Sequence, residues 1–159
     1  MAARNRWHWR LAWHGLGLGC AVAALVGVLV SVLDRSIVGL YTHDAVVTAA
    51  ALPLIAWVAL FHLADAAQTI AAFVLRAWRI ATVPLVVYGV ALWGIGLGGG
   101  FTLAFDLTGQ TPASLQGARG FWVTSTIGLI VAALALCGYL AWMLRRMARE
   151  ASAPVTSAA

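Results

Sequence analysis

Charged side chains are scarce in this sequence of 159 residues, and lysine is absent. Asp, Glu, Lys and Arg together make up 9% of the residues, and apolar residues make up 63%. A soluble domain is about one-quarter charged, so this composition excludes an ordinary water-soluble globule and a disordered chain. The formal net charge of +5 comes from arginine. In so apolar a chain arginines indicate membrane topology, not a surface that binds nucleic acid.

Reactive and metal-binding patterns are also missing from the sequence. Cys20 and Cys137 both lie in apolar runs, so there is neither a disulfide framework nor a Cys-x-x-Cys spacing. His8, His14 and His43 lie at predicted membrane borders, and their spacing does not place ligands on one helix face. No catalytic triad, nucleotide motif or glycine-rich phosphate loop occurs. We therefore expect no metal site, no cofactor and no enzymatic activity.

Four apolar segments are each long enough to cross a bilayer, which takes roughly 20 helical residues. These segments are 11–33, 45–75, 82–105 and 120–144. The sequence therefore predicts an all-α integral membrane protein with four transmembrane helices. The first segment is too long for the apolar region of a signal peptide, so we expect it to be retained. Asp44 is expected to cap the second helix, and Pro53 is expected to kink it.

The arginines are distributed unequally between the two predicted sides of the membrane. Eight of the ten lie in the basic N-terminus 1–10, in the joint after the second segment, or in the tail 145–159. Arg35 and Arg119 lie on the other side. The positive-inside rule therefore predicts that both termini are in the cytoplasm, with the protein in the bacterial inner membrane. The tail 145–159 is expected to be disordered, because its end consists of small and polar residues.

Asp65 is the only carboxylate inside a predicted span. It lies eleven residues before Arg76, or about 16 Å along a helix, which places it near the middle of the membrane. A carboxylate at this depth is costly unless it faces a cavity or a partner. The spacing of its neighbours on the helix predicts a shared face. These neighbours are Phe61, His62, Gln68 and Thr69.

Two interpretations of this face remain open. In the first, Asp65 binds a proton, a sodium ion or an organic cation one at a time, which is the minimum requirement for antiport. In the second, Asp65 forms hydrogen bonds with a neighbouring helix and only stabilises packing. His62 could tune Asp65 or relay a proton, and the alternative is a hydrogen-bonded packing residue.

Glycines at helical spacing mark the third segment. Gly94 with Gly98, and Gly96 with Gly100, form two GxxxG pairs. Such pairs favour close helix packing, and a point at which the helix bends is the alternative. In the fourth segment the hydroxyl groups at 124–126 are expected to bond to the backbone and not to a substrate.

Motifs in this order resemble the MATE (multidrug and toxic compound extrusion) transporters, in their NorM-type branch. The segments LYTHDAVV (40–47) and LFHLADAAQ (60–68) resemble the family pattern LFT-x-D-x-x-V … FQ-x-x-D-x-x-Q. Further similarities follow at Leu75-Arg76, Pro84, Trp93, Gly96-Leu97, Gly100-Phe101, residues 117–122 and residues 127–129. The resemblance covers nearly the whole chain with its order and spacing preserved.

This resemblance implies a twelve-helix, two-lobed transporter that expels cationic, often aromatic drugs in exchange for Na⁺ or H⁺. The four spans correspond to helices nine to twelve of the C-terminal lobe. Asp65 falls on the family's cation-site aspartate, with Phe61 beside it and His62 and Gln68 lining the site. Departures from the family pattern are His62 for glutamine, Phe73 for a small residue, Ala77 for glycine, Ile80 for an acidic residue and Gly98 for proline.

The missing eight helices lead us to expect a fragment or a piece of a split transporter, whose partners are the absent N-terminal helices, the lipid bilayer and drug-like cations. Two rivals remain. One is a self-contained small multidrug exporter that acts as an oligomer. The other is an inert membrane fragment.

Overall fold

The computed structural model describes the backbone of residues 2–152 and the side chains of residues 11–55 and 57–150. No strand occurs within this part of the chain. The elements are α1 (Ala2–Val32), α2 (Asp34–Tyr41), α3 (Ala45–Ala77), α4 (Thr82–Tyr88), the π-helix η1 (Gly89–Gly98), α5 (Gly99–Ala104), the 3-10 turn η2 (Ala113–Leu115) and α6 (Ala118–Ser152).

Four stretches of these helices are long and apolar enough to cross a membrane. They are Leu11–Val32, Ala45–Ala77, Thr82–Ala104 and Ala118–Glu150. Each lies on one of the four segments that the sequence predicts, with ends that differ by a few residues except at the end of α6. The expected all-α, four-helix membrane protein is therefore confirmed.

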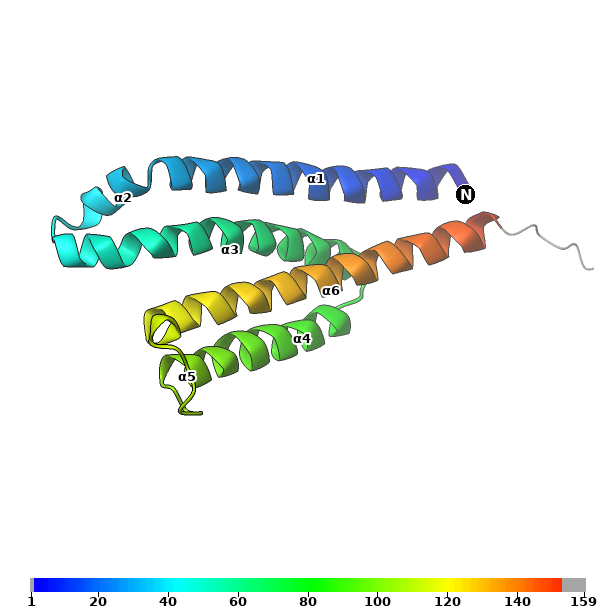
Figure 1. Ribbon diagram of the computed structural model, residues 1–159. Coiled ribbons are helices and arrows are strands. Elements are labelled where there is room, and N and C mark those ends of the chain that lie inside the picture. Colours follow the sequence, from blue (N-terminus) through cyan, green and yellow to red (C-terminus); the bar gives the residue numbers. More distant parts are fainter. Residues whose placement is uncertain (1, 153–159) are drawn as a thin grey trace, which may run out of the picture.

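The long helices lie side by side, with α3 and α6 at the centre (Figure 1). α1 packs on α3, and the continuous stretch α4–η1–α5 packs on the other side of α6. The start of α1, the turn between α3 and α4, and the end of α6 lie toward one end of the bundle (Figure 1). These are the regions in which the sequence concentrates its arginines.

The polar joint after the first span contains a short helix that the sequence analysis did not predict. α2 begins at Asp34 and buries Val38, and its neighbour Ile37 is half-buried. Asp34 lies in the first turn, where a negative charge favours the helix dipole. α2 packs on α3 and ends at Tyr41, before the extended residue Thr42.

Both ends of α3 are set by local hydrogen bonds. Asp44 Oδ1 accepts from the backbone N–H groups of Val46 at 2.7 Å and Val47 at 3.2 Å, which confirms the predicted N-cap. At the other end the N–H of Ile80 donates to the Leu75 carbonyl at 3.0 Å. Arg79 has the left-handed φ of 60° that completes this Schellman turn. Between these ends α3 continues through Pro53 as one helix.

The third span changes its winding in the middle of its length. It begins as the α-helix α4, becomes a π-helix over Gly89–Gly98 and returns to α-helix in α5. π-Helical turns are rare and usually short, so ten residues of this winding are unusual. The glycines at 89, 94, 96 and 98 remove side chains from its surface.

The end of α6 corrects the prediction for the tail. Residues 145–152, which were expected to be disordered, continue the helix as far as Ser152. Arg146 Nε forms an ion pair with Glu150 Oε1 at 2.9 Å, one turn further on. Arginine is a good helix former, and a cation near a helix C-terminus is favourable. Residues 153–159 lie outside the described part of the chain.

The main packing contact joins α3 to α6 through small and branched residues. Ala71, Ala72 and Leu75 of α3 form a buried cluster with Leu136 and Leu140 of α6. Alanine allows two membrane helices to approach closely, which strengthens van der Waals packing where no water drives association. A second buried cluster lies one to two turns away along α3, and it forms the surroundings of Asp65 described below.

Candidate functional site

The Asp65 carboxylate accepts a hydrogen bond within α3. Gln68 Nε2 donates to Asp65 Oδ1 at 2.9 Å and to Thr69 Oγ1 at 2.8 Å. Gln68 is only 6% exposed, and Asp65 and Thr69 are half-buried. The three side chains therefore form one polar cluster, which confirms the predicted proximity of Asp65, Gln68 and Thr69.

The second polar atom of the Gln68 side chain has no partner within the part of the chain that the structure describes. Gln68 Oε1 is buried and accepts no hydrogen bond from any described residue. An unpaired buried carbonyl usually costs about 1–3 kcal/mol, so its presence calls for an explanation. It lies beside a carboxylate and a hydroxyl, and these are all oxygen ligands of the kind that hard cations bind. The cluster can thus offer several oxygens to one cation.

Aromatic rings from two helices meet one turn before Asp65. Phe61 of α3 packs edge-to-face against Trp122 of α6, with 5.9 Å between ring centroids and 74° between the planes. Both side chains are half-buried. Such rings can attract an organic cation through their faces. Trp122 was not predicted as a site residue, because residues 61 and 122 are far apart in sequence and no spacing rule predicts their contact. The one sequence signal for Trp122 was the similarity of residues 117–122 to the family pattern.

His62 does not join the cluster. Its side chain is exposed, and no hydrogen bond or ion pair connects it to Asp65 within the described residues. The helical rotation that brings Gln68 toward the α6 side leaves His62 on the surface of α3. The structure therefore brings together Phe61, Asp65 and Gln68, and leaves the fourth predicted site residue apart.

Apolar side chains surround this polar cluster. Ala64 packs with Leu129 and Ala133 of α6, and Leu92 of η1 is packed against them. Tyr88 of α4 is close enough to interact electrostatically with both Asp65 and Arg76. The residue next to Asp65 thus packs against α6 and η1, and Asp65 itself interacts with Tyr88 of α4. Among the described residues no group of three His, Cys, Asp or Glu side chains forms a metal site.

The π-helix packs against α6 beside this site. Thr124 Oγ1 donates to the Gly96 carbonyl at 3.0 Å across the two helices and to the Gly120 carbonyl at 2.9 Å in its own helix. A side chain at Gly100 would collide with Phe121 and Thr124. At Gly94 the space is open. Of the two GxxxG pairs, only Gly96 with Gly100 therefore serves helix packing.

Two of the three hydroxyl-bearing residues at 124–126 follow the expectation from sequence, whereas the Ser125 hydroxyl forms no hydrogen bond with a described residue. Thr126 Oγ1 donates to the Trp122 carbonyl at 2.7 Å, and Thr126 is fully buried. Thr124 bonds to its own helix and also reaches the facing one. Both of these hydroxyl groups donate to backbone carbonyls, and the Thr124 hydroxyl also links α6 to η1.

Similarity to known proteins agrees with this arrangement. No family profile matches the chain. It is 34% identical over 136 residues to the probable multidrug resistance protein NorM of Aromatoleum aromaticum, which is 86% of this chain and 28% of that protein. It is 37% identical over 135 residues to the multidrug resistance protein PmpM of Pseudomonas aeruginosa, covering 85% of this chain and 27% of the relative.

A third relative has the same pattern of coverage. The multidrug resistance protein NorM of Vibrio cholerae is 34% identical over 129 residues, covering 81% of this chain and 28% of the relative. The chain is a homologue of the NorM-type MATE proteins. All three relatives are named as multidrug resistance proteins. The NorM-like chain spans slightly more than a quarter of the length of each of them.

Proposed function

We propose that this NorM-like chain supplies the cation-binding part of a multidrug antiporter, which exports cationic drugs in exchange for Na⁺ or H⁺. The observation that supports this proposal is the buried Gln68 amide. Its Nε2 donates a hydrogen bond to Asp65, and its Oε1 accepts none from a described residue. Pure packing leaves no reason to bury an unpaired carbonyl beside a mid-membrane carboxylate.

The proposed mechanism is competition for one carboxylate. When Asp65 is ionised, the amide N–H of Gln68 stabilises its charge, and Gln68 Oε1 and Thr69 Oγ1 are available as further ligands for Na⁺. When Asp65 binds a proton, the amide can turn so that its oxygen accepts from the carboxylic acid. Either ion neutralises the site, so that a drug cation and the coupling ion exclude one another.

The aromatic pair gives the site its proposed preference for aromatic cations. Phe61 and Trp122 lie one helical turn from Asp65 and remain partly accessible. A flat cation could contact a ring face while its charge is balanced by the carboxylate. His62 is exposed and takes no direct part in this scheme.

We also propose which side of the membrane the termini occupy and which helices complete the transporter. The positive-inside rule supports cytoplasmic termini in a bacterial inner membrane, and the arginine-rich regions lie toward one end of the bundle (Figure 1). The relatives are more than three times as long as the matched region. We propose that the remaining helices of such a transporter close the cavity in front of Asp65.

Efflux in a pump-deficient bacterial host tests this function. We expect ethidium accumulation to fall when the chain is co-expressed with the first eight helices of a NorM relative, and Asp65→Asn should abolish that fall. Asp34→Asn, in the exposed joint, is the matched control and should leave efflux unchanged. Immunoblots of membranes establish that each variant is present.

Three outcomes would contradict parts of the proposal. Efflux by the chain alone, abolished by Asp65→Asn, would favour a small exporter that assembles from copies of this chain. Efflux that survives Asp65→Asn would remove Asp65 from the mechanism. No efflux in any combination, with the proteins present in the membrane, would favour an inert membrane segment.

A further inference from the structure

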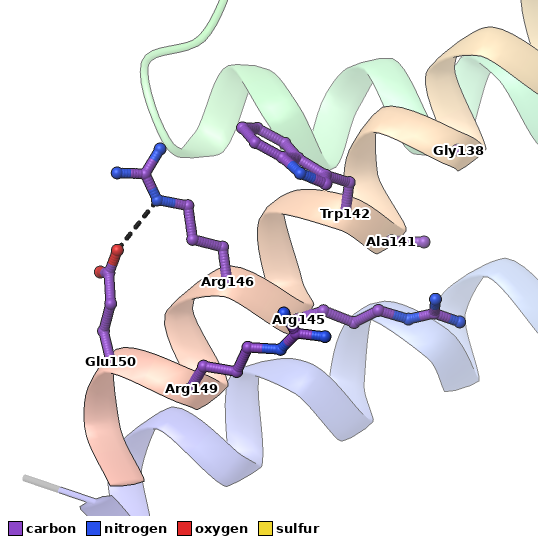
Figure 2. Close-up of a pocket in the computed structure, with 7 residues that line it drawn as sticks. All are labelled: Gly138, Ala141, Trp142, Arg145, Arg146, Arg149 and Glu150. Carbon is purple, nitrogen blue, oxygen red and sulfur yellow. Dashed lines mark hydrogen bonds and ion pairs between the residues drawn. The ribbon is translucent and has the colours of Figure 1, made fainter. Parts of the chain in front are cut away.

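A pocket of about 550 Å³ lies along the last turns of α6, far in sequence from the Asp65 cluster (Figure 2). Its volume falls within the range of roughly 300–1,000 Å³ that small-molecule sites occupy. Its lining residues recur at helical spacing on one face of α6: Gly138, Ala141, Trp142, Arg145, Arg146, Arg149 and Glu150. It shares no residue with the candidate cation site.

The charges in this pocket are only partly compensated. Arg146 pairs with Glu150 at 2.9 Å, and its guanidinium lies over the Trp142 ring at 5.9 Å from the centroid. Arg145 and Arg149 form no hydrogen bond or ion pair with any described residue. Figure 2 shows these two side chains extending to the same side of α6, away from Arg146 and Trp142. Two positive charges one turn apart therefore have no counter-charge among the described side chains.

The apolar part of the pocket continues from these arginines into the membrane span. Gly138 lies seven residues before Arg145, or about 10 Å along the helix axis. Gly138 and Ala141 have little or no side chain, so they leave a hollow on the helix surface. Trp142, which is 53% exposed, follows Ala141 directly on α6 and also lines the pocket. Tryptophan at this position is typical of the boundary between hydrocarbon and headgroups.

We propose that this pocket binds an anionic phospholipid, with the headgroup phosphate between Arg145 and Arg149 and an acyl chain over Gly138 and Ala141. Guanidinium groups bind phosphate oxygens through paired hydrogen bonds. Basic pockets at the cytoplasmic ends of transmembrane helices recognise such headgroups. The assignment to the cytoplasmic leaflet rests on the orientation proposed above, whereas the binding itself does not.

Charge and shape together favour a lipid over other occupants. A free phosphate ion would use the two arginines and leave the apolar hollow empty. A packed helix would fill the hollow and would bury Arg145 and Arg149 without a counter-charge, which costs several kcal/mol per ion. A phospholipid matches both the apolar hollow and the two cations. It also lies in the bilayer that surrounds α6.

Native mass spectrometry of the purified full chain tests this proposal. The probes are cardiolipin and phosphatidylglycerol, with phosphatidylcholine as the neutral lipid. We expect Arg145→Gln/Arg149→Gln to weaken binding of the anionic lipids by about tenfold or more. The matched control is Arg76→Gln/Arg79→Gln, which removes the same charge near the same end of the bundle outside the pocket and should change binding less than twofold. Ala141→Leu should also weaken binding, because it fills the hollow.

Four results would overturn the proposal. Equal binding of phosphatidylcholine, or an equal loss in the Arg76→Gln/Arg79→Gln control, would show that no specific headgroup site exists. Displacement of the lipid by millimolar inorganic phosphate would show a free-phosphate site. Loss of the lipid when the upstream helices are added would show that protein fills the pocket. Asp65→Asn should bind lipid as the unmodified chain does, so failure of this site and failure of the proposed antiport are distinguishable.

Discussion

Gln68 donates to Asp65 through Nε2 at 2.9 Å, while Oε1 of the same amide is buried and accepts no hydrogen bond from a described side chain or backbone group. The two residues are three positions apart on α3, so the helix itself holds them in this geometry. The amide offers both a donor and an acceptor next to the only membrane carboxylate. This arrangement suits a carboxylate that changes its bound cation.

Gln68→Leu is expected to impair transport without unfolding the helix bundle. The change removes the hydrogen bond to Asp65, which is worth about 1.5–3 kcal/mol for a charged acceptor, and it also removes the unpaired Oε1. We therefore expect efflux to fall about tenfold or more in the form of the protein that supports transport. Gln110→Leu, in the exposed loop, is the control and should transport normally. Normal efflux by Gln68→Leu would remove Gln68 from the site.

Gly100→Ala should destabilise the bundle, and Gly94→Ala should not. A Cβ at Gly100 would collide with Phe121 and Thr124 of α6, whereas nothing lies within 4 Å of one at Gly94. Overpacking costs about 1–3 kcal/mol, so Gly100→Ala should lower the free energy of unfolding by this amount. Denaturant titration in micelles measures the difference. Equal effects of the two substitutions would contradict the assignment of packing to Gly96 and Gly100 alone.

Asp106 makes the stability of the loop after α5 depend on pH. The backbone N–H of Thr111 donates to Asp106 Oδ1 at 2.8 Å, and this bond holds the pKa of the carboxyl below its usual value. A lowered folded pKa stabilises the protein at pH values above the usual one of about 3.9. That stability is lost as the pH falls through the lower folded value.

Thermal unfolding from pH 7 down to pH 2 measures this contribution. Asp106→Asn should abolish the part of the acid-dependent loss that Asp106 causes, so the difference between the two proteins should shrink as the pH falls. A constant difference across the whole range would show that the Thr111 bond does not favour the charged carboxylate. The loop lies outside the spans, so the measurement does not disturb the Asp65 site.

Arg79→Gly is expected to stabilise the turn between α3 and α4. Arg79 has a φ of 60°, which costs a residue with a side chain about 1–2 kcal/mol and costs glycine little. Because glycine also loses more entropy on folding, the expected net gain is about 0.5–1 kcal/mol. Arg76→Gly, within the helix, is the matched control and should cost about 1 kcal/mol. A loss of stability with Arg79→Gly would show that the arginine side chain has a role of its own.

Local chemistry made much of the fold predictable from sequence. The four spans followed from apolar length, and the cap at Asp44 followed from its position before an apolar run. The proximity of Asp65 and Gln68 followed from a spacing of three on one helix. The helix α2 and the helical end of α6 were not predicted, because short amphipathic turns and isolated ion pairs such as Arg146–Glu150 give weak signals in an apolar chain.

The contacts between helices could not be predicted from the sequence and became visible only in the three-dimensional structure. The pairing of Phe61 with Trp122, the choice of Gly96 and Gly100 over Gly94 and Gly98, and the exposure of His62 all depend on which face of one helix meets another. Helical spacing in the sequence shows which residues share a face of one helix, but it does not show which other helix packs against that face. The π-helix at Gly89–Gly98 likewise shifts the register of the third span in a way that no spacing rule predicts.

The amino-acid sequence by itself determined that this protein is a bundle of membrane helices with one carboxylate near mid-membrane. The physical reason is that a long apolar helix is stable in the bilayer and a charged side chain is costly there, whichever helices lie beside it. Only the tertiary structure decided that Phe61 contacts Trp122, that His62 lies exposed, and that Arg145 and Arg149 line the same pocket as Gly138 and Ala141. Those features depend on helix rotation and packing, which many residues far apart in sequence set together.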